Sequence, residues 1–283
     1  MKRSLFFVLI LSLAASACSL PFTVAVAPTA TELVLPSETP TPADTSTPTE
    51  TPLPPTDTPT ASETPEPSET PTITPTATEP PFDPSASYGS ATIFDTLDNN
   101  NNWVGANGSL PDTEFLRLAL GGGRLHVTGK QANFDTWWYS WPNPTDLFIQ
   151  MAVETDNCSG KQAYGVIVHG PQDSNVSNAR GYIFTFSCDG AYSLTRLDDT
   201  SPYTTEELIP WTESEHINSG SDERNVMGIR MIGGDITLYA NGFEIADLDD
   251  DTYLVGRFGL FVNGGALGNF TYSVDEFAYW DLD

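Results

Sequence analysis

Alternation of hydrophobic and polar positions is clearest over residues 225–247, where it predicts a three-stranded β-meander. The pairs Gly233-Gly234 and Asn241-Gly242 mark its two hairpin turns, because Gly and Asn tolerate the positive φ angles that such turns need. With the turns placed there, one face is apolar and the other is polar, which is typical of an antiparallel sheet packed on a core. The predicted apolar pairs are Ile229 with Leu238, Met231 with Ile236, Leu238 with Ile245, and Ala240 with Phe243. The polar face carries Arg230, Thr237, Tyr239 and Glu244.

Similar alternation recurs through the second half of the chain, and no stretch has the period of an amphipathic helix. Turn signals such as Asp189-Gly190 separate the runs. About a dozen short strands joined mostly by hairpins predict an all-β fold, a two-sheet antiparallel jelly-roll sandwich. The predicted strands are 91–96, 115–120, 124–128, 146–154, 163–169, 181–187, 192–197, 225–232, 235–240, 243–248, 257–262 and 270–280.

Residues 1–17 have the composition of a signal peptide. Lys2 and Arg3 precede an apolar run and then the small residues Ala15-Ser16-Ala17, an order typical of a secretory signal. Because Cys18 follows directly, the segment resembles a bacterial lipoprotein signal, which implies that Cys18 is diacylated and becomes the mature N-terminus. That family prefers Leu where Ala15 stands, and Ala-Ser-Ala is also an ordinary cleavage site. Secretion without an anchor is therefore the alternative.

Residues 18–87 are dominated by Thr, Pro, Ser and Glu and contain few aromatic residues. Such a segment buries too little apolar surface to offset its loss of conformational entropy, so we expect a disordered linker. From Pro28 onwards the frequent prolines favour an extended polyproline II conformation of about 3.1 Å per residue, so about sixty residues reach on the order of 180 Å when stretched. Together with lipidation, this predicts a stalk that holds the C-terminal domain, residues 88–283, outside the cytoplasm at the bacterial cell envelope.

The charge of the chain limits the kinds of partner that it can bind. The formal net charge is −27; the signal contributes +2 and the linker −10, so −19 falls on residues 88–283. A strongly negative field disfavours DNA, RNA and anionic lipid surfaces. We therefore expect no nucleic acid partner, contact with the membrane through the lipid anchor alone, and a monomeric domain.

Two further cysteines lie in turn-like segments of the domain, Cys158 in TDNCSG and Cys188 in FSCDGAY. An even number of cysteines in an exported domain favours a disulfide between them. Two buried free thiols are the alternative.

The runs AYGVIVHG, GYIFTFSCDGAYSL, NVMGIRMIGGDITLYANGFEIADL, GRFGLFVNGG and FTYSVDEFAYW together resemble the concanavalin A-like lectin/glucanase superfamily, and most closely its laminin-G-like and keto-disaccharide-hydrolase-like domains. The resemblance implies a two-sheet jelly roll with a concave face that binds carbohydrate or protein. It also implies a structural Ca²⁺ between the first and last strands, with Asp95 in TIFDT and Asp275 in SVDEF at the matching positions. Ordinary acidic turns are the alternative.

Part of this superfamily hydrolyses glycans with paired carboxylates. The closest match to its E-x-D-x-x-E motif begins at Glu154 and Asp156, but the second Glu is missing and the run enters the Cys158 turn. A solvated strand end explains these two residues as well. We therefore predict no catalytic residue, and enzyme activity is unsupported.

Exposed aromatic rings are the remaining candidates for ligand contact, since sugar rings stack on flat aromatic faces. Packing between the sheets is the alternative for each of them. The predicted ligand-binding residues are Trp137, Trp138, Tyr139, Trp141, Trp211, Arg230 and Tyr239.

These observations favour a lipid-anchored surface protein with a non-catalytic, lectin-like domain that binds a polysaccharide or another surface polymer. A glycan-active hydrolase that uses Glu154 or Asp156 with another carboxylate is the second hypothesis. A purely structural envelope domain is the third.

Overall fold

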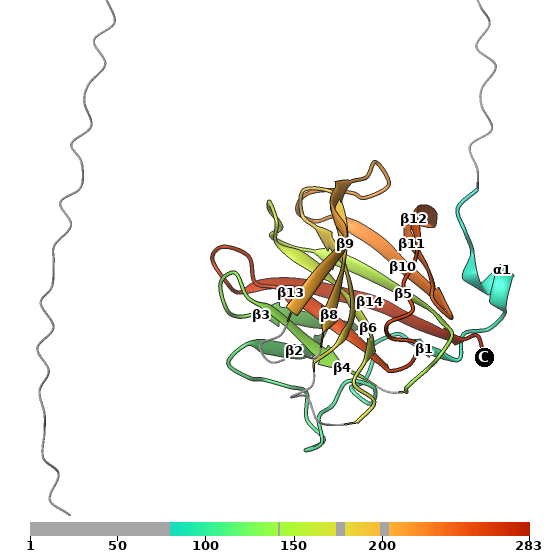
Figure 1. The fold of residues 1–283 in the computed structure, drawn as a ribbon. Helices are drawn as coiled ribbons and strands as arrows, with labels where there is room; N and C mark the ends of the chain where they lie inside the picture. The colour runs from blue at the N-terminus through green and yellow to red at the C-terminus, as the bar shows by residue number, and fades with distance from the viewer. Residues whose placement is uncertain (1–79, 141, 174–178, 199–203) are drawn as a thin grey trace, which may run out of the picture. The chain divides into compact units, whose positions relative to one another are not determined.

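The structure is a computed structural model that describes residues 80–283 except 141, 174–178 and 199–203. The signal peptide, Cys18, nearly all of the predicted linker and Trp141 lie outside the described residues. Two antiparallel sheets packed face to face confirm the predicted all-β sandwich (Figure 1). In the part of the chain that the structure describes, no helix is long and apolar enough to cross a membrane.

The larger sheet, sheet A, has eight strands in the described residues. Its order is β12-β11-β10-β5-β14-β3-β2, and β1 pairs with β14 beside this path. The strands are β1 (Ile93–Asp95), β2 (Leu116–Gly121), β3 (Arg124–Gly129), β5 (Leu147–Thr155), β10 (Arg224–Ile232), β11 (Asp235–Ala240), β12 (Phe243–Asp249) and β14 (Phe270–Asp281).

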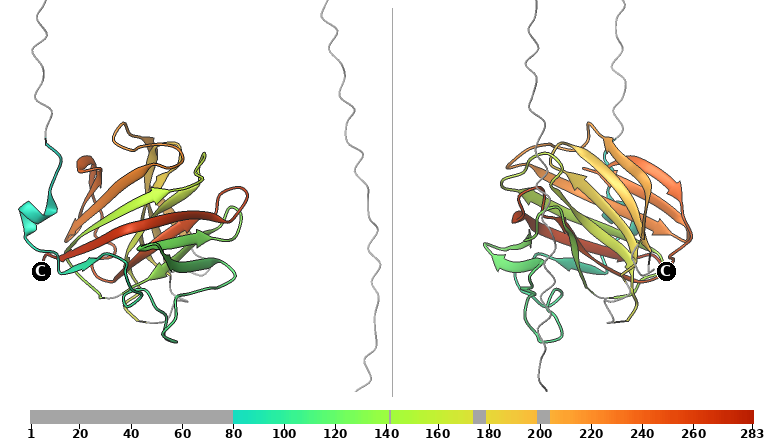
Figure 2. Two further views of the ribbon diagram at one scale, coloured as in Figure 1. Left: turned by 180° about the vertical axis from the view of Figure 1, so that it is seen from behind. Right: turned by 60° about the vertical axis from the view of Figure 1, so that its left-hand side comes forward.

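The smaller sheet, sheet B, has six strands in the order β4-β13-β6-β7-β8-β9. Figure 2 shows the two sheets from behind and from the side. The strands are β4 (Asp135–Tyr139), β6 (Ala163–Gly170), β7 (Gly181–Ser187), β8 (Ala191–Asp198), β9 (Thr204–Glu213) and β13 (Arg257–Asn263).

Strand alternation separates the core between the sheets from their outer faces. On β7, Tyr182, Phe184 and Phe186 pack in the core, whereas Ile183 belongs to a second apolar cluster with Phe261 of β13. Because successive side chains of a strand point to opposite faces, this second cluster lies on the outer face of sheet B. By the same rule, a third cluster that includes Phe148, Tyr239 and Trp280 lies on the outer face of sheet A. The sandwich therefore has one central core and two distinct outer faces.

Each predicted strand is present, with ends that differ by a few residues. Two strands were not predicted, β4 (Asp135–Tyr139) and β9 (Thr204–Glu213), and both are edge strands of sheet B. Most residues of β9 are exposed. Edge strands of this kind lack the hydrophobic alternation on which the prediction depends.

The meander over β10, β11 and β12 has the predicted turns and nearly the predicted register. Ile229 lies opposite Leu238 and Ala240 opposite Phe243, as expected. The prediction that Leu238 lies opposite Ile245 was wrong, because a register shift between Leu238 and Tyr239 places Ala246 there. A β-bulge adds one residue to a strand, and hydrophobic periodicity does not reveal such an insertion.

A short helix, α1 (Pro84–Tyr88), precedes the first strand and was not predicted. Asp83 caps it by accepting hydrogen bonds from the Ser85 and Ala86 backbone N–H groups, and Pro84 occupies its first turn. Phe82, ahead of the predicted domain start at residue 88, already packs on sheet A.

Candidate functional site

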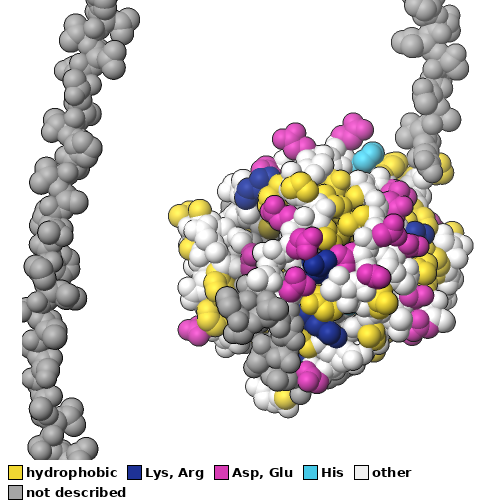
Figure 3. Space-filling view, in the orientation of Figure 1, with side chains coloured by type: hydrophobic (Ala, Val, Ile, Leu, Met, Phe, Trp, Pro, Cys, Tyr) yellow, Lys and Arg dark blue, Asp and Glu magenta, His cyan; other side chains and the backbone are white. Residues whose placement is uncertain are grey.

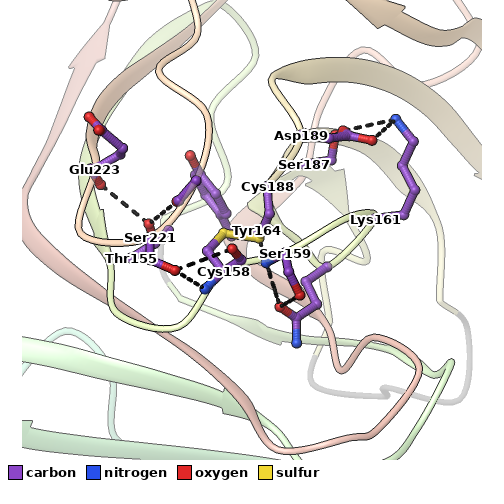
Figure 4. Close-up of a disulfide and its surroundings, with 12 residues drawn as sticks. Thr155, Cys158, Ser159, Lys161, Tyr164, Ser187, Cys188, Asp189, Ser221 and Glu223 are labelled. Atoms are coloured by element: carbon purple, nitrogen blue, oxygen red, sulfur yellow. Dashed lines mark hydrogen bonds and ion pairs between the residues drawn. A yellow bond between two sulfur atoms is a disulfide. The ribbon is translucent and has the colours of Figure 1, made fainter.

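A disulfide between Cys158 and Cys188 joins the loop after β5 to the turn after β7, which confirms the predicted pair (Figure 4). Backbone hydrogen bonds support the same contact, since the Cys188 N–H donates to the Gln162 carbonyl at 3.0 Å and the Asp189 N–H to the Gly160 carbonyl at 3.1 Å. The bond fixes residues 159–162 at one end of sheet B. A disulfide is also typical of proteins that fold outside the reducing cytoplasm.

The outer face of sheet B is hollowed into a cleft of about 680 Å³, the sheet B cleft. Ile183 and Phe261 give its floor an apolar part. Beside them, Thr185, Ser193 and Thr195 of the neighbouring strands β7 and β8 form a row of hydroxyl groups. The Thr185 Oγ1 and Ser193 Oγ atoms are 2.8 Å apart. The floor thus combines apolar surface with hydrogen-bonding groups, as sites for small polar ligands do.

Polar side chains from both edges of sheet B line the rim of this cleft. On the β4 side, Asn263 donates a hydrogen bond of 2.6 Å from Nδ2 to Asp135 Oδ1. On the β9 side, Trp211 is 39% exposed, and the Lys161 ammonium lies 4.8 Å from its ring centroid. Asp189 holds Lys161 in an ion pair of 2.9 Å. Lys161, from the loop that the disulfide fixes, thus contacts the ring of Trp211, which β9 places at the rim.

The carboxylates that line the sheet B cleft are Asp135 and Glu207 among the described residues. Asp135 belongs to β4 and Glu207 to β9, at opposite edges of the six-stranded sheet. At roughly 4.8 Å per strand spacing, five spacings separate them by about 24 Å along the sheet. Glycosidase pairs lie roughly 5 to 9.5 Å apart. The two carboxylates are therefore not spaced for glycoside hydrolysis.

Glu154, which the alternative hydrolase hypothesis names as a carboxylate, lies elsewhere. It is on β5, where alternation directs it to the outer face of sheet A. A hydrogen bond from Arg124, with an N–O distance of 2.7 Å, lowers the pKa of the Glu154 carboxyl below its ordinary value. A general acid needs a raised pKa instead, so Glu154 is poorly suited to protonate a leaving group.

A second cleft of about 970 Å³, the edge cleft, lies along the free side of β4. Residues 101, 102 and 104–106 form its opposite wall. Trp138 Nε1 donates to the Trp103 carbonyl at 3.0 Å, and Ser140 Oγ donates to the Asn102 carbonyl at 2.6 Å, so this loop is attached to the strand. Phe115 completes the aromatic part of the lining.

The predicted ligand-binding residues occupy three separate places. Trp137, Trp138 and Tyr139 lie together on β4 and line the edge cleft, whereas Trp211 lies at the rim of the sheet B cleft. Arg230 and Tyr239 are on the outer face of sheet A, which is the opposite side of the sandwich from the sheet B cleft.

Neither Arg230 nor Tyr239 lines the sheet B cleft or the edge cleft. Tyr239 is 7% exposed and stacks on Phe82, with ring centroids 4.9 Å apart. Arg230 donates from Nη2 to Thr237 Oγ1 at 2.7 Å. The exposed polar face predicted for the meander is thus partly covered by the chain's own N-terminal segment.

The two residues predicted to bind Ca²⁺ have other partners. The Asp95 carboxylate accepts hydrogen bonds from the Leu97 N–H, Asn102 Nδ2 and Trp103 Nε1. Asp275 pairs with Arg124 at 2.8 Å. Within the described residues, no group of three or more His, Cys, Asp or Glu side chains is placed to hold a metal ion. N–H donors and a guanidinium occupy the carboxylate oxygens to which Ca²⁺ would have to bind, so the side-chain arrangement in this structure does not fit the ion. Calcium binding itself is untested and stays a prediction.

The row of hydroxyl groups in the sheet B cleft was not predicted from the sequence. The sequence does contain a sign of this row, because Thr185 stands between Phe184 and Phe186, and Ser193 and Thr195 flank Leu194. Polar residues at every second position of a strand identify one face of the sheet. Recognising that β7 and β8 are neighbours requires the fold.

Neither protein-family models nor curated protein sequences give a match to this chain. Solved structures do give matches. A carbohydrate-binding module, CBM66 of Bacillus subtilis, aligns with 12% identity over 60% of this chain and 94% of the module, with a TM-score of 0.47. A family 16 glycoside hydrolase of Bacteroides ovatus aligns with 10% identity over 66% of this chain and 99% of the enzyme, with a TM-score of 0.48.

A Bacillus subtilis protein of unknown function with a galectin-like fold gives a similar result, with 10% identity over 69% of this chain and 97% of that chain and a TM-score of 0.46.

Proposed function

We propose that residues 88–283 form a non-catalytic domain that binds a neutral polysaccharide in the sheet B cleft. The observation that carries this proposal is the composition of the cleft. Its floor places the apolar side chains of Ile183 and Phe261 beside the hydroxyl groups of Thr185, Ser193 and Thr195. A sugar ring has an apolar C–H face and a hydroxyl periphery, so this combination complements it. Trp211 at the rim supplies a flat ring for stacking.

The charge of the domain supports a neutral ligand. Of the formal charge of −27 on the whole chain at pH 7, −19 falls on residues 88–283. Acidic side chains are scattered over the face shown in Figure 3, where lysines and arginines are fewer. A polyanion such as a uronic acid polymer is repelled by a field of this sign. The wide separation of Asp135 and Glu207 supports binding without hydrolysis.

The test is affinity electrophoresis of the protein in gels that contain a neutral polysaccharide: mixed-linkage glucan, xylan, laminarin or fructan. We expect retardation by at least one of them and none by polygalacturonate. Trp211→Ala should weaken binding about tenfold, which corresponds to about 1.4 kcal/mol. Phe94→Ala is the matched control, because Phe94 is an aromatic residue that is 60% exposed on β1 of sheet A. Unchanged mobility in all four neutral gels would overturn the proposal.

We further propose that Cys18 carries a lipid and that residues 18–87 hold the domain away from the membrane. The order of Ala15-Ser16-Ala17 before Cys18 supports the lipid, and the Pro/Thr-rich composition supports the extended stalk. Detergent phase partitioning of the expressed chain tests this. The chain should enter the detergent phase, and Cys18→Ser should move it to the aqueous phase. If the unaltered chain is found in the aqueous phase, it is secreted without an anchor.

A further inference from the structure

The edge cleft is lined by the kinds of residue that are found in binding sites, and it is separate from the sheet B cleft. It has four aromatic rings, from Phe115 in the loop before β2 and from residues 137–139 of β4. Arg257 at its end is 5% exposed and lies 5.1 Å from the Tyr139 ring centroid. Arg257 also donates from Nε to the Pro171 carbonyl at 2.7 Å. Aromatic surface with a few fixed polar groups is typical of ligand sites.

The two clefts lie on either side of one strand. Asp135 of β4 lines the sheet B cleft, and the next residue, Thr136, lines the edge cleft. Trp137 packs against the outer-face cluster that contains Phe261, which is part of the sheet B cleft floor. A ligand chain that leaves the sheet B cleft on the β4 side therefore reaches the edge cleft next.

An exposed aromatic pair marks the boundary between the two clefts. The rings of Phe115 and Phe134 stack with centroids 4.9 Å apart, and the two residues are 36% and 43% exposed. Gln131 Nε2 donates to the Glu114 carbonyl at 3.1 Å and ties the two loops together. Large apolar side chains that remain exposed beside clefts mark interaction sites. The boundary is thus itself a surface on which a sugar ring can stack.

From this continuity we propose that the edge cleft is a second carbohydrate subsite, and that the ligand is an extended polysaccharide chain which crosses β4 between the two clefts. This inference rests on the proposed function, because it assigns the same neutral glycan to both clefts. β4 is an edge strand, paired with β13 alone among the described strands. Edge strands direct backbone N–H and C=O groups outward at alternate residues, and these are suitable partners for sugar hydroxyls. Two linked subsites bind a long chain more tightly than either binds alone.

The experiment measures affinity against chain length. Oligosaccharides of increasing length, prepared from whichever neutral polysaccharide binds the protein, are titrated by calorimetry into the full chain. We expect affinity to rise about tenfold once the oligosaccharide is long enough to occupy both clefts. Phe115→Ala should remove this rise and leave the affinity for the shortest ligands unchanged. Trp211→Ala should lower the affinity for oligosaccharides of every length.

A second variant is needed as a control, because Phe115→Ala can also change the structure of its loop. Ala106 is an exposed residue of the edge cleft wall, so Ala106→Arg places a long side chain in the cleft without disturbing the core. It should reduce the affinity for long oligosaccharides as Phe115→Ala does. The inference is overturned if short and long oligosaccharides bind equally, or if both edge-cleft variants bind long ones normally. In either case the weaker binding of Trp211→Ala would still uphold the proposed function.

Discussion

The outer face of sheet A is covered by another segment of the chain, whereas the outer face of sheet B is open. On sheet A, Phe148, Tyr239 and Trp280 gather on the outer face, and the N-terminal segment covers them with Phe82 and Tyr88. On sheet B, the corresponding surface is a cleft floored partly by hydroxyl groups. Burial of apolar surface contributes roughly 25 cal/mol per Å², so three large aromatic side chains gain much from a cover. A face that includes Thr and Ser gains less, and it stays open to ligands.

The cover on sheet A also determines where the chain enters the domain. The Phe82 N–H donates to the Gly242 carbonyl at 2.6 Å, and Trp280 Nε1 donates to the Gly89 carbonyl at 2.9 Å. The chain therefore joins the sandwich along sheet A, on the far side from the sheet B cleft.

The largest expected effect comes from the open face and its disulfide. Replacing both cysteines, Cys158→Ser with Cys188→Ser, should lower the free energy of unfolding by about 3 kcal/mol, because the bond closes a loop with a sequence separation of 30. The loop 159–162 lines the sheet B cleft, so glycan affinity should fall as well. Urea unfolding of the oxidised chain and of the double variant measures the first effect. Equal unfolding midpoints would show that the bond contributes nothing to stability.

On the covered face, Phe82→Ala should lower the free energy of unfolding by about 2 kcal/mol. Phe82 is half-buried between Tyr239 and Phe148, with centroids 4.9 and 5.5 Å away, so its loss costs less than that of a core Phe. Phe94→Ala should change stability by less than about 0.5 kcal/mol, since Phe94 is exposed. Thermal unfolding of both variants provides the comparison. Glycan binding by Phe82→Ala should be unchanged, and a loss of binding would mean that the two faces are coupled.

A third effect concerns the contacts between the two sheets at Asp250, which follows β12 of sheet A and touches β7 and β8 of sheet B. Burial raises the pKa of the Asp250 carboxyl, but hydrogen bonds from Tyr182, Thr252 and Arg196 outweigh it and lower the pKa to about 2. A depressed folded-state pKa adds stability that is fully present above the unfolded pKa, ordinarily near about 3.9. This added stability is lost as the pH falls through the folded-state pKa.

We therefore expect the melting temperature to fall as the pH is lowered from about 4 towards 2, and Asp250→Asn to flatten part of this fall. Thermal unfolding across this pH range measures both. The Asp250 carboxylate contacts Tyr182 of β7 at 2.6 Å and Arg196 of β8 at 2.5 Å, so protonation loosens these contacts between the sheets rather than either outer face. A variant that is as acid-sensitive as the unaltered chain would assign the effect to other carboxylates.

The residues that line the clefts were harder to predict than the strands. The run of aromatic residues at 137–139 was recognised as a ligand candidate, but its separation from Trp211 depends on the strand order of sheet B. Tyr239 and Trp211 are both aromatic residues in strands, yet one is 7% and the other 39% exposed. What covers Tyr239 is Phe82, which is more than 150 residues away in sequence. No local pattern reveals a contact of that kind.

The sequence by itself determined the strands with hydrophobic alternation, the turns with Gly and Asn, and the pairing of Cys158 with Cys188, because these depend on local periodicity, backbone preference and cysteine number. The tertiary structure alone decided which outer face is covered and which is open. It also placed the hydroxyl groups of β7 and β8 side by side and put a cleft on each side of β4. These features arise from contacts between segments that are distant in sequence, where strand order and long-range packing, rather than local preference, determine what each side chain meets.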